Sequence, residues 1–169
     1  MSLHAFATGH FLGPNLKARC ALGRGGVIAA SAKREGDGAS PAGIWPLRLL
    51  LYRPDRESRP NTALPCRTLT PSDGWCDAPG DPAYNRLVAH PYPASAERLW
   101  REDHVYNLIV VLGFNDDPVI PGRGSAIFLH LAHADWRATE GCVAIDQETM
   151  QAVLGFAKPG DTLTIAATA

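Results

Sequence analysis

Short apolar runs, separated by glycine, proline and polar loops, recur along the whole chain. The runs are too short for typical helices and are rich in β-branched residues, which favours strands. One of them, Leu108-Ile109-Val110-Val111-Leu112, is continuously apolar, and this predicts a strand that is buried on both faces. Strands are therefore expected within residues 16–22, 26–30, 47–52, 105–112, 126–131 and 162–166.

Two segments have a helical pattern instead. Residues 95–101 form a short candidate, and residues 147–155 form a stronger one. In the stronger segment Asp146 is a suitable N-cap, Glu148 lies in the first turn, and Gly155 can end the helix. The chain is thus predicted to be mostly β, with one or two short helices. The apolar face of the stronger helix comprises Met150, Val153 and Leu154.

Two long polar loops, residues 33–43 and 71–85, interrupt the apolar runs. The total length of 169 residues suits one domain that spans residues 1–169. Loops this long in a compact domain are usually functional or disordered. The aromatic residues Trp75 and Tyr84 argue against disorder, so a functional role is expected for these loops.

Charge and hydropathy exclude several classes of partner. Sixteen Lys and Arg balance seventeen Asp and Glu, so nothing indicates binding to nucleic acid or to an anionic membrane. No stretch approaches the roughly 20 apolar residues of a membrane span. The N-terminus lacks the charged and apolar regions of a signal peptide, so either the protein is cytoplasmic or a leader lies outside this chain.

Four cysteines are present, at positions 20, 66, 76 and 142. No C-x-x-C pair occurs, so a zinc ribbon is not expected. A chain of this size needs no disulfide framework, and a buried small side chain is the plainest role for each cysteine. A bridge among Cys20, Cys66 and Cys76 stays open, because spacing alone does not decide it.

The segment between residues 124 and 145 has the clearest chemical content. A predicted strand ends in His130, and the step Gly141-Cys142 follows a loop and precedes the stronger helix. Glycine beside cysteine leaves backbone N–H groups free to face a ligand, so the N–H groups of Gly141 and Cys142 are candidates for an oxyanion hole. A histidine within hydrogen-bond reach can deprotonate the thiol. Cys142 is therefore the expected nucleophile and His130 its base.

These residues resemble the catalytic motif of the L,D-transpeptidase (YkuD-type) family. His130 matches the family's strand-terminal histidine, and Thr139-Glu140-Gly141-Cys142-Val143-Ala144 matches its Ser/Thr-His-Gly-Cys motif and the residues after it. Upstream, Ser40-Pro41-Ala42-Gly43 resembles the family's Thr-Pro-x-Gly turn before a strand.

Three departures from the family pattern indicate a divergent, short bacterial subfamily. Cys142 follows His130 by only twelve residues, a few fewer than is usual in the family. Glu140 replaces the histidine before Gly-Cys, and Ala144 replaces an arginine or asparagine. The nucleophile and base are retained, so the changes are expected to affect recognition of the substrate.

The resemblance implies a β-sandwich fold and peptidoglycan L,D-transpeptidation. Cys142 would attack a carbonyl of the donor stem peptide, D-alanine would leave with a proton from His130, and an amine of the acceptor stem would resolve the thioester. The backbone carbonyl of Leu131 would fix the tautomer of His130. No metal or organic cofactor is implied, and the protein is expected to act as a monomer in the periplasm or cell wall.

The resemblance also implies acylation by carbapenems. Pairing with an imidazolium and the helix that follows are expected to lower the pKa of Cys142, which should then be the most reactive of the four cysteines. Arg123, just before the predicted strand of His130, is the candidate to bind the stem carboxylate in place of the missing arginine. Further candidates for substrate contact are Glu140, Thr139, Tyr84 and Asn85.

Three alternatives remain open at this point. A hydrolase on the same scaffold, an L,D-carboxypeptidase or amidase, would resolve the thioester with water. A catalytically silent module would bind peptidoglycan without needing Cys142 and His130. A zinc site formed by His130, His133 and Cys142 is disfavoured, because residues three apart on a continuing strand face opposite sides, which would keep His133 out of the site.

Overall fold

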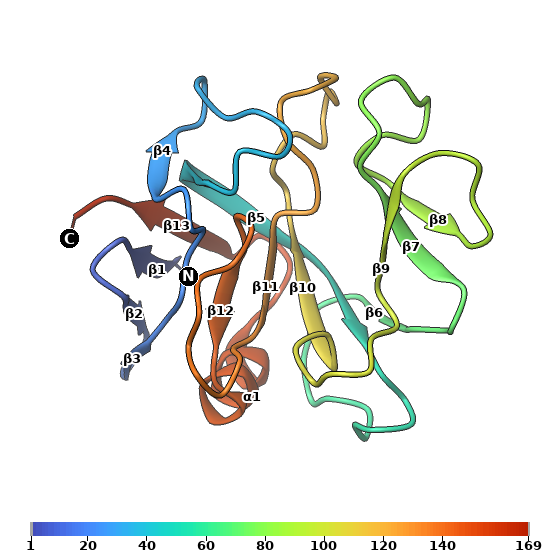
Figure 1. Ribbon diagram of the computed structural model, residues 1–169. Coiled ribbons are helices and arrows are strands. Elements are labelled where there is room, and N and C mark those ends of the chain that lie inside the picture. The colour runs from blue at the N-terminus through green and yellow to red at the C-terminus, as the bar shows by residue number, and fades with distance from the viewer. Residues whose placement is uncertain (1, 169) are drawn as a thin grey trace.

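Strands dominate the computed structural model, which describes residues 2–168 (Figure 1). Within that range the chain forms thirteen strands and one helix, which confirms a mostly β fold. The elements are β1 Ser2–Phe6, β2 His10–Gly13, β3 Leu16–Arg19, β4 Val27–Ala29, β5 Ser40–Tyr52, β6 Cys66–Thr68, β7 Asp73–Cys76, β8 Leu87–Ala89, β9 Ala96–Arg98, β10 Leu108–Leu112, β11 Phe128–Leu131, β12 Val143–Ile145, α1 Gln147–Phe156 and β13 Thr162–Ala166.

The long strand β5 connects the two halves of a ten-stranded sheet. The sheet has the order β12-β11-β10-β5-β13-β1-β2-β3, and β4 and β6 also pair with β5. Residues 43–46 of β5 pair with β13, whereas residues 47–52 pair with β10. The two halves therefore share one strand, and the sheet curls into a barrel-like sandwich, which confirms the β-sandwich fold that the resemblance implies.

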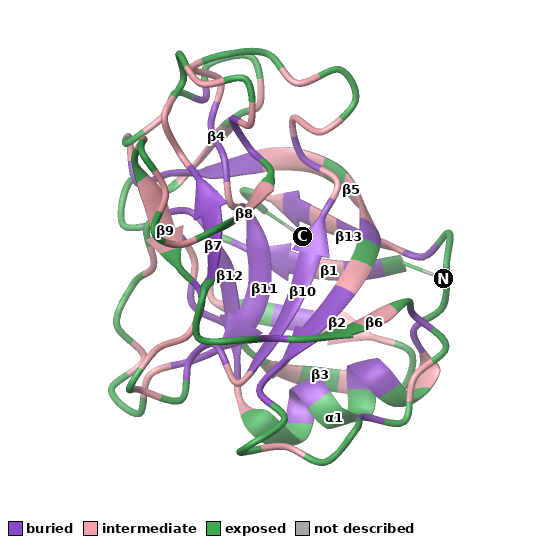
Figure 2. Ribbon diagram, turned by 90° about the vertical axis from the view of Figure 1, so that its right-hand side faces the viewer, coloured by how far each residue is buried: buried purple, intermediate pink, exposed green. Residues whose placement is uncertain are grey.

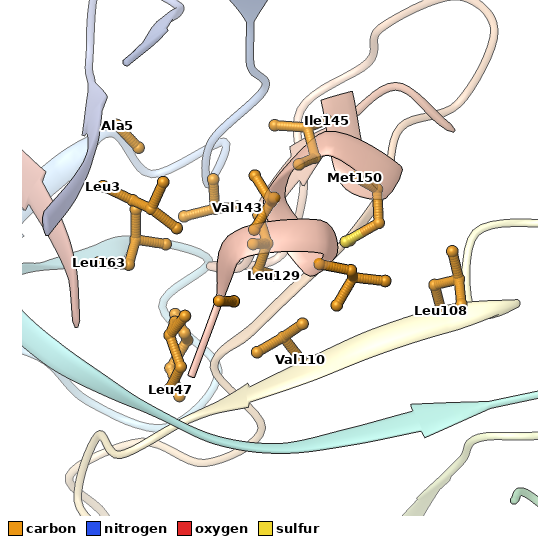
Figure 3. Close-up of a cluster of buried hydrophobic side chains, with 14 of the residues drawn as sticks. Leu3, Ala5, Leu47, Leu108, Val110, Leu129, Val143, Ile145, Met150 and Leu163 are labelled. Carbon is orange, nitrogen blue, oxygen red and sulfur yellow. The ribbon is translucent and has the colours of Figure 1, made fainter. Parts of the chain in front are cut away.

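The main core fills the inside of this curled sheet. Side chains from β1 and β13 meet those from β10, β11 and β12, and α1 covers the opening with its apolar face. Figure 3 shows these side chains pointing into one cluster. Burial of each such side chain contributes about 1.5–3 kcal/mol to folding. Among the residues of this core are Leu3, Leu163, Leu108, Val110, Leu129, Val143 and Met150.

The opposite face of β10 and β11 carries a second core. Because side chains alternate along a strand, Ile109 and Phe128 point away from α1. They pack under a separate three-stranded sheet of order β8-β7-β9, where the Trp75 ring meets the Phe128 ring edge-on at 5.1 Å. All residues of β10, β11 and β12 are buried, as Figure 2 shows, which confirms that the 108–112 run is covered on both faces.

The stronger of the two expected helices is present as α1. The carboxylate of Asp146 accepts a hydrogen bond from the Thr149 backbone N–H at 2.7 Å, so the N-cap prediction is confirmed. Gly155 does not end the helix, which continues to Phe156 and has Ala157 as its C-cap. Packing of the apolar face against the main core holds this last turn in place.

The prediction of a second helix at residues 95–101 is wrong. Residues Ala96–Arg98 form β9, in which Glu97 pairs with Trp75 of β7. A segment this short cannot form a stable helix without tertiary support, whereas the edge of β7 supplies partners for its backbone. β7 itself lies inside the expected 71–85 loop, and its four residues are all buried.

The fold makes the N-cap of α1 a testable contribution to stability. Asp146→Ala should lower the free energy of unfolding by about 0.5–2 kcal/mol, because the first turn of α1 loses its capping acceptor. Asp146→Asn, which keeps a capping oxygen, is the matched control and should stay close to the wild type. Urea unfolding of the three proteins checks this, and equal stability of the Ala and Asn variants would contradict it.

Candidate active site

The expected nucleophile and base lie in one cavity of about 650 Å³ between the large sheet and the β8-β7-β9 sheet. The cavity lies on the face of β10 and β11 that points away from α1. Its ionisable lining consists of Cys142, His130, His133, Lys33, Arg101, Arg137, Glu35, Asp77, Glu97, Glu140 and Tyr106.

Parallel pairing of β11 with β12 sets the relation between Cys142 and His130. Leu129 pairs with Val143, and both side chains enter the main core. Side chains alternate along a strand. His130, which follows Leu129, and Cys142, which precedes Val143, therefore both point to the cavity face. Both are buried, with 6% and 8% of their surface exposed. Among residues 2–168 no hydrogen bond joins the Cys142 sulfur to the His130 ring.

Cys142 is held as a thiol. Its Sγ donates a hydrogen bond to the Ala126 carbonyl at 3.1 Å and accepts one from the Phe128 N–H at 3.4 Å. Burial raises the pKa of Cys142 to about 12, and the negative charge of Glu97 acts in the same direction. The lowered pKa expected from the sequence is therefore wrong for the resting protein, because desolvation outweighs the stabilising N–H of Phe128.

His130 is held as a neutral imidazole. Its Nδ1 lies 2.8 Å from the Leu131 carbonyl oxygen, and because a carbonyl only accepts, Nδ1 carries the proton. The Tyr106 ring packs edge-on against His130 at 5.2 Å. Burial lowers the pKa of His130 to about 4, so Nε2 is free to accept a proton at neutral pH.

The Gly141 turn positions the nucleophile. Gly141 has a φ of 133°, and a Cβ there would lie 2.8 Å from the Ala39 carbonyl oxygen, so only glycine fits. Its carbonyl accepts a hydrogen bond from Ser40 Oγ at 2.8 Å. Its N–H donates to Thr139 Oγ1 at 3.1 Å, and that hydroxyl donates to the Cys142 carbonyl at 2.7 Å. Thr139 thus holds the turn, and the N–H of Cys142 is the remaining oxyanion-hole candidate.

Asn85, an expected substrate contact, is a buried structural residue. Its Oδ1 accepts hydrogen bonds from Trp75 Nε1 at 2.9 Å and from the Ala126 N–H at 3.0 Å. The backbone of Ala126 has a φ of 53°, and its carbonyl is the acceptor for the Cys142 thiol. Asn85 therefore holds the Ala126 backbone, which contacts Cys142, and does not itself line the cavity.

Tyr84 is likewise buried and does not line the cavity. Its hydroxyl donates to Glu35 and accepts from the Gly124 N–H at 3.0 Å. Tyr84 and Asn85 thus pack against the site, where the sequence predicted that they would contact substrate. The sequence alone cannot distinguish packing against the site from contact with substrate, because both roles place aromatic and amide groups in a loop.

Arg123 does not line the cavity either, which argues against its expected role as carboxylate anchor. Its guanidinium donates to the Ser31 carbonyl. Glu140 does lie at the cavity, where it is exposed and forms an ion pair with Arg24 at 2.9 Å. The cations that line the cavity, which sequence reasoning missed, are Lys33, Arg101 and Arg137.

His133 shares the cavity with His130, contrary to expectation. The expectation assumed a continuing strand, but β11 ends at Leu131 and the chain turns. Arg137 Nη2 lies 3.1 Å from the ring of His133. No group of three metal-ligating side chains occurs in the part of the chain that the structure describes. All four cysteines are free thiols, so no bridge joins Cys20, Cys66 and Cys76.

Glu97 and Tyr106 also line the cavity, and no pattern in the sequence indicated either of them. Glu97 lay in the segment expected to be helical, and β9 instead directs it to the cavity. The Tyr106 hydroxyl donates to Glu97 Oε1 at 2.6 Å. Burial is the main cause of a raised pKa for Glu97. Glu97 thus adds an acidic group to the cavity of Cys142, and no sequence motif predicts it.

The buried neutral histidine should make stability depend on pH. The folded pKa of His130, about 4, lies below its ordinary value of 6.5, so unfolding takes up a proton. The stabilising contribution is present above pH 6.5 and is lost as the pH falls toward 4. The difference in unfolding free energy between wild type and His130→Asn should therefore shrink over this range. Urea unfolding between pH 7 and 4 measures it, and a constant difference would contradict the assignment.

The thiols should react in an order set by exposure. Cys66 is half-buried, whereas Cys142 is buried and has a pKa of about 12. A small neutral electrophile such as iodoacetamide, at limiting dose and pH 7, should therefore modify Cys66 before Cys142. Peptide mapping gives the order, and labelling in denaturant, where all four thiols should react alike, is the control. Preferential labelling of Cys142 would restore the sequence-based expectation.

Comparison with known proteins gives one family. The family model described as YkuD, L,D-transpeptidase catalytic domain, matches residues 10–165, which is nearly the whole chain and includes both faces of the cavity. Comparison with curated proteins and with solved structures gives no match.

Proposed function

The chain belongs to the L,D-transpeptidase catalytic-domain family, and we propose that it cross-links peptidoglycan stem peptides through a cysteine thioester. The observation that carries the proposal is the placement of Cys142 and His130 on one face of neighbouring strands, with Nδ1 of the histidine bound to the Leu131 carbonyl. This leaves Nε2 as a proton acceptor on the cavity side.

The first step is acylation of Cys142. The thiol proton passes to His130 Nε2 as the sulfur attacks the carbonyl carbon of the donor peptide. The S–C bond forms, the C–N bond to the terminal D-alanine breaks, and the proton on His130 goes to the leaving amine. The developing oxyanion accepts a hydrogen bond from the Cys142 N–H.

Entry of the substrate is what activates this pair. In the resting protein both groups are uncharged, since burial opposes the thiolate and the imidazolium alike. Proton transfer between them therefore accompanies bond formation and does not precede it. The thiol must also leave its hydrogen bond to the Ala126 carbonyl in order to reach the substrate.

The second step decides between transfer and hydrolysis. An amine from the acceptor stem attacks the thioester, His130 removes its proton, and the thiol is restored when the C–S bond breaks. Water in place of the amine gives an L,D-carboxypeptidase or amidase. The cavity of about 650 Å³ is in the range of sites that hold a peptide-sized ligand, and we propose transfer as the outcome.

We place the protein in the periplasm or cell wall, where the proposed substrate is found. No helix among residues 2–168 is long and apolar enough to cross a membrane. The proposed chemistry uses only this chain's own residues, without a metal or an organic cofactor.

Acyl-enzyme formation tests the proposal directly. Incubation with a tetrapeptide donor or a carbapenem should add the acyl group, or the intact carbapenem, to Cys142, as read by intact-protein and peptide mass spectrometry. Cys142→Ala should abolish the adduct, and His130→Ala should slow its formation by about 10²–10⁴-fold, as expected for a lost general base.

Cys66→Ala removes a thiol outside the cavity and is the matched control. It should form the adduct at the wild-type rate. Cross-linked dimers in the products indicate transfer, and shortened monomers indicate hydrolysis. Peptidoglycan binding without any adduct on Cys142 would instead identify a silent binding module and end the enzyme proposal.

A further inference from the structure

Three carboxylates form one wall of the cavity that contains Cys142. Glu35 lies in the loop before β5, Asp77 directly follows β7, and Glu97 lies in β9. We call these three residues the acidic wall. None of them has a cation within ion-pair distance in the described part of the chain. The proposed reaction assigns them no role.

The other charges of the cavity already have partners. Each lining cation faces a carboxylate that lies outside the lining, and the fourth lining acid, Glu140, is paired with Arg24. The acidic wall is therefore the part of the lining charge that takes part in no ion pair among residues 2–168. The paired cations are Lys33 with Asp37 at 2.5 Å, Arg101 with Asp103 at 2.6 Å and Arg137 with Asp135 at 4.0 Å.

Hydrogen bonds to the acidic wall are also incomplete. Glu35 accepts from the hydroxyls of Tyr84 and Ser125, and Glu97 accepts from the Tyr106 hydroxyl. Asp77 Oδ1 is buried and has no hydrogen-bond partner among residues 2–168. A buried carboxylate oxygen without a donor is unfavourable, so this atom indicates a donor that arrives with the ligand.

The negative charges of Asp77 and Glu35 both act on Glu97. Burial is the largest cause of the raised pKa of Glu97, and the charges of Asp77 and Glu35 raise it further, whereas the Tyr106 hydrogen bond and the nearby Arg101 lower it. A cation placed between these groups would relieve both the repulsion and the unpaired oxygen.

We propose that the acidic wall binds a primary ammonium group of the substrate. An ammonium has three N–H donors and no acceptor, which suits a site whose free groups are carboxylate oxygens. The inference rests on the proposed acyl transfer. Two groups of a diaminoacyl stem peptide share this chemistry, namely the side-chain ammonium of the donor and the attacking amine of the acceptor before it loses its proton.

The donor is tested with two tetrapeptides that differ only at the residue whose carbonyl is attacked, lysine in one and norleucine in the other. The rate of thioester formation on Cys142 is measured by intact mass. If the donor ammonium is bound, the wild type should acylate faster with lysine by about 10–100-fold, the scale of a charge-assisted hydrogen bond. Glu97→Gln and Asp77→Asn should each remove most of this preference, measured within each protein as the ratio of the lysine rate to the norleucine rate.

The acceptor is tested on the acyl-enzyme made with the norleucine donor. Methylamine, a cation at pH 7, and hydroxylamine, which is neutral, are compared as nucleophiles. If the acceptor amine is bound, the same variants should lower the ratio of the methylamine rate to the hydroxylamine rate about 10-fold or more. Glu97→Gln retains an acceptor for the Tyr106 hydroxyl, which favours correct folding.

Glu102→Gln is the matched control, because Glu102 is exposed and lies outside the cavity. It should leave all four rates at wild-type values. A charge preference in either arm that the acidic-wall variants remove supports the inference and identifies the source of the ammonium. Equal rates with lysine and norleucine, and an unchanged ratio of the methylamine rate to the hydroxylamine rate in the variants, would overturn the inference while the thioester itself still supports acyl transfer. Absence of a thioester with either donor would overturn both.

Discussion

The parallel pairing of β11 with β12 is the constraint on which the rest of the site depends. Because Leu129 and Val143 pair and both point into the main core, His130 and Cys142 must emerge together on the other face. A slip of one residue in this register would bury the histidine against α1 and expose core side chains. The core therefore enforces the geometry of the proposed catalytic pair, and α1, although remote from the cavity, helps to fix it.

Burial determines the charge states of Cys142 and His130. A thiol with a pKa of about 12 and an imidazole with a pKa of about 4 remain uncharged together at neutral pH. In the proposed reaction this charge state protects Cys142 from indiscriminate attack, and bound substrate promotes the proton transfer. In the same cavity Glu35, Asp77 and Glu97 take part in no ion pair with the residues that the structure describes, and we propose that their charges select a cationic group of the ligand.

Local patterns in the sequence were sufficient for part of the fold and of the site. The helix after Asp146 and the buried 108–112 strand follow from capping and from apolar runs, which act over a few residues. The motif around Gly141 and Cys142 similarly indicated a tight turn, and the positive φ of Gly141 is a local property of the backbone. Interactions between residues that are close in the sequence determine these features, so the sequence alone is enough to predict them.

Long-range pairing decided the remainder. The 95–101 segment became a strand because β7 offered it a backbone partner, and this pairing turned Glu97 toward Cys142. His133 entered the cavity because β11 ends at Leu131, so the alternation expected for a strand that continues to residue 133 does not apply. The pKa shifts of Cys142 and His130 follow from the depth at which two sheets enclose them. The sequence by itself thus pointed to Cys142 and His130 as candidates for the chemistry. Only the tertiary structure decided their surroundings, since burial and charge arise from segments far apart in the chain.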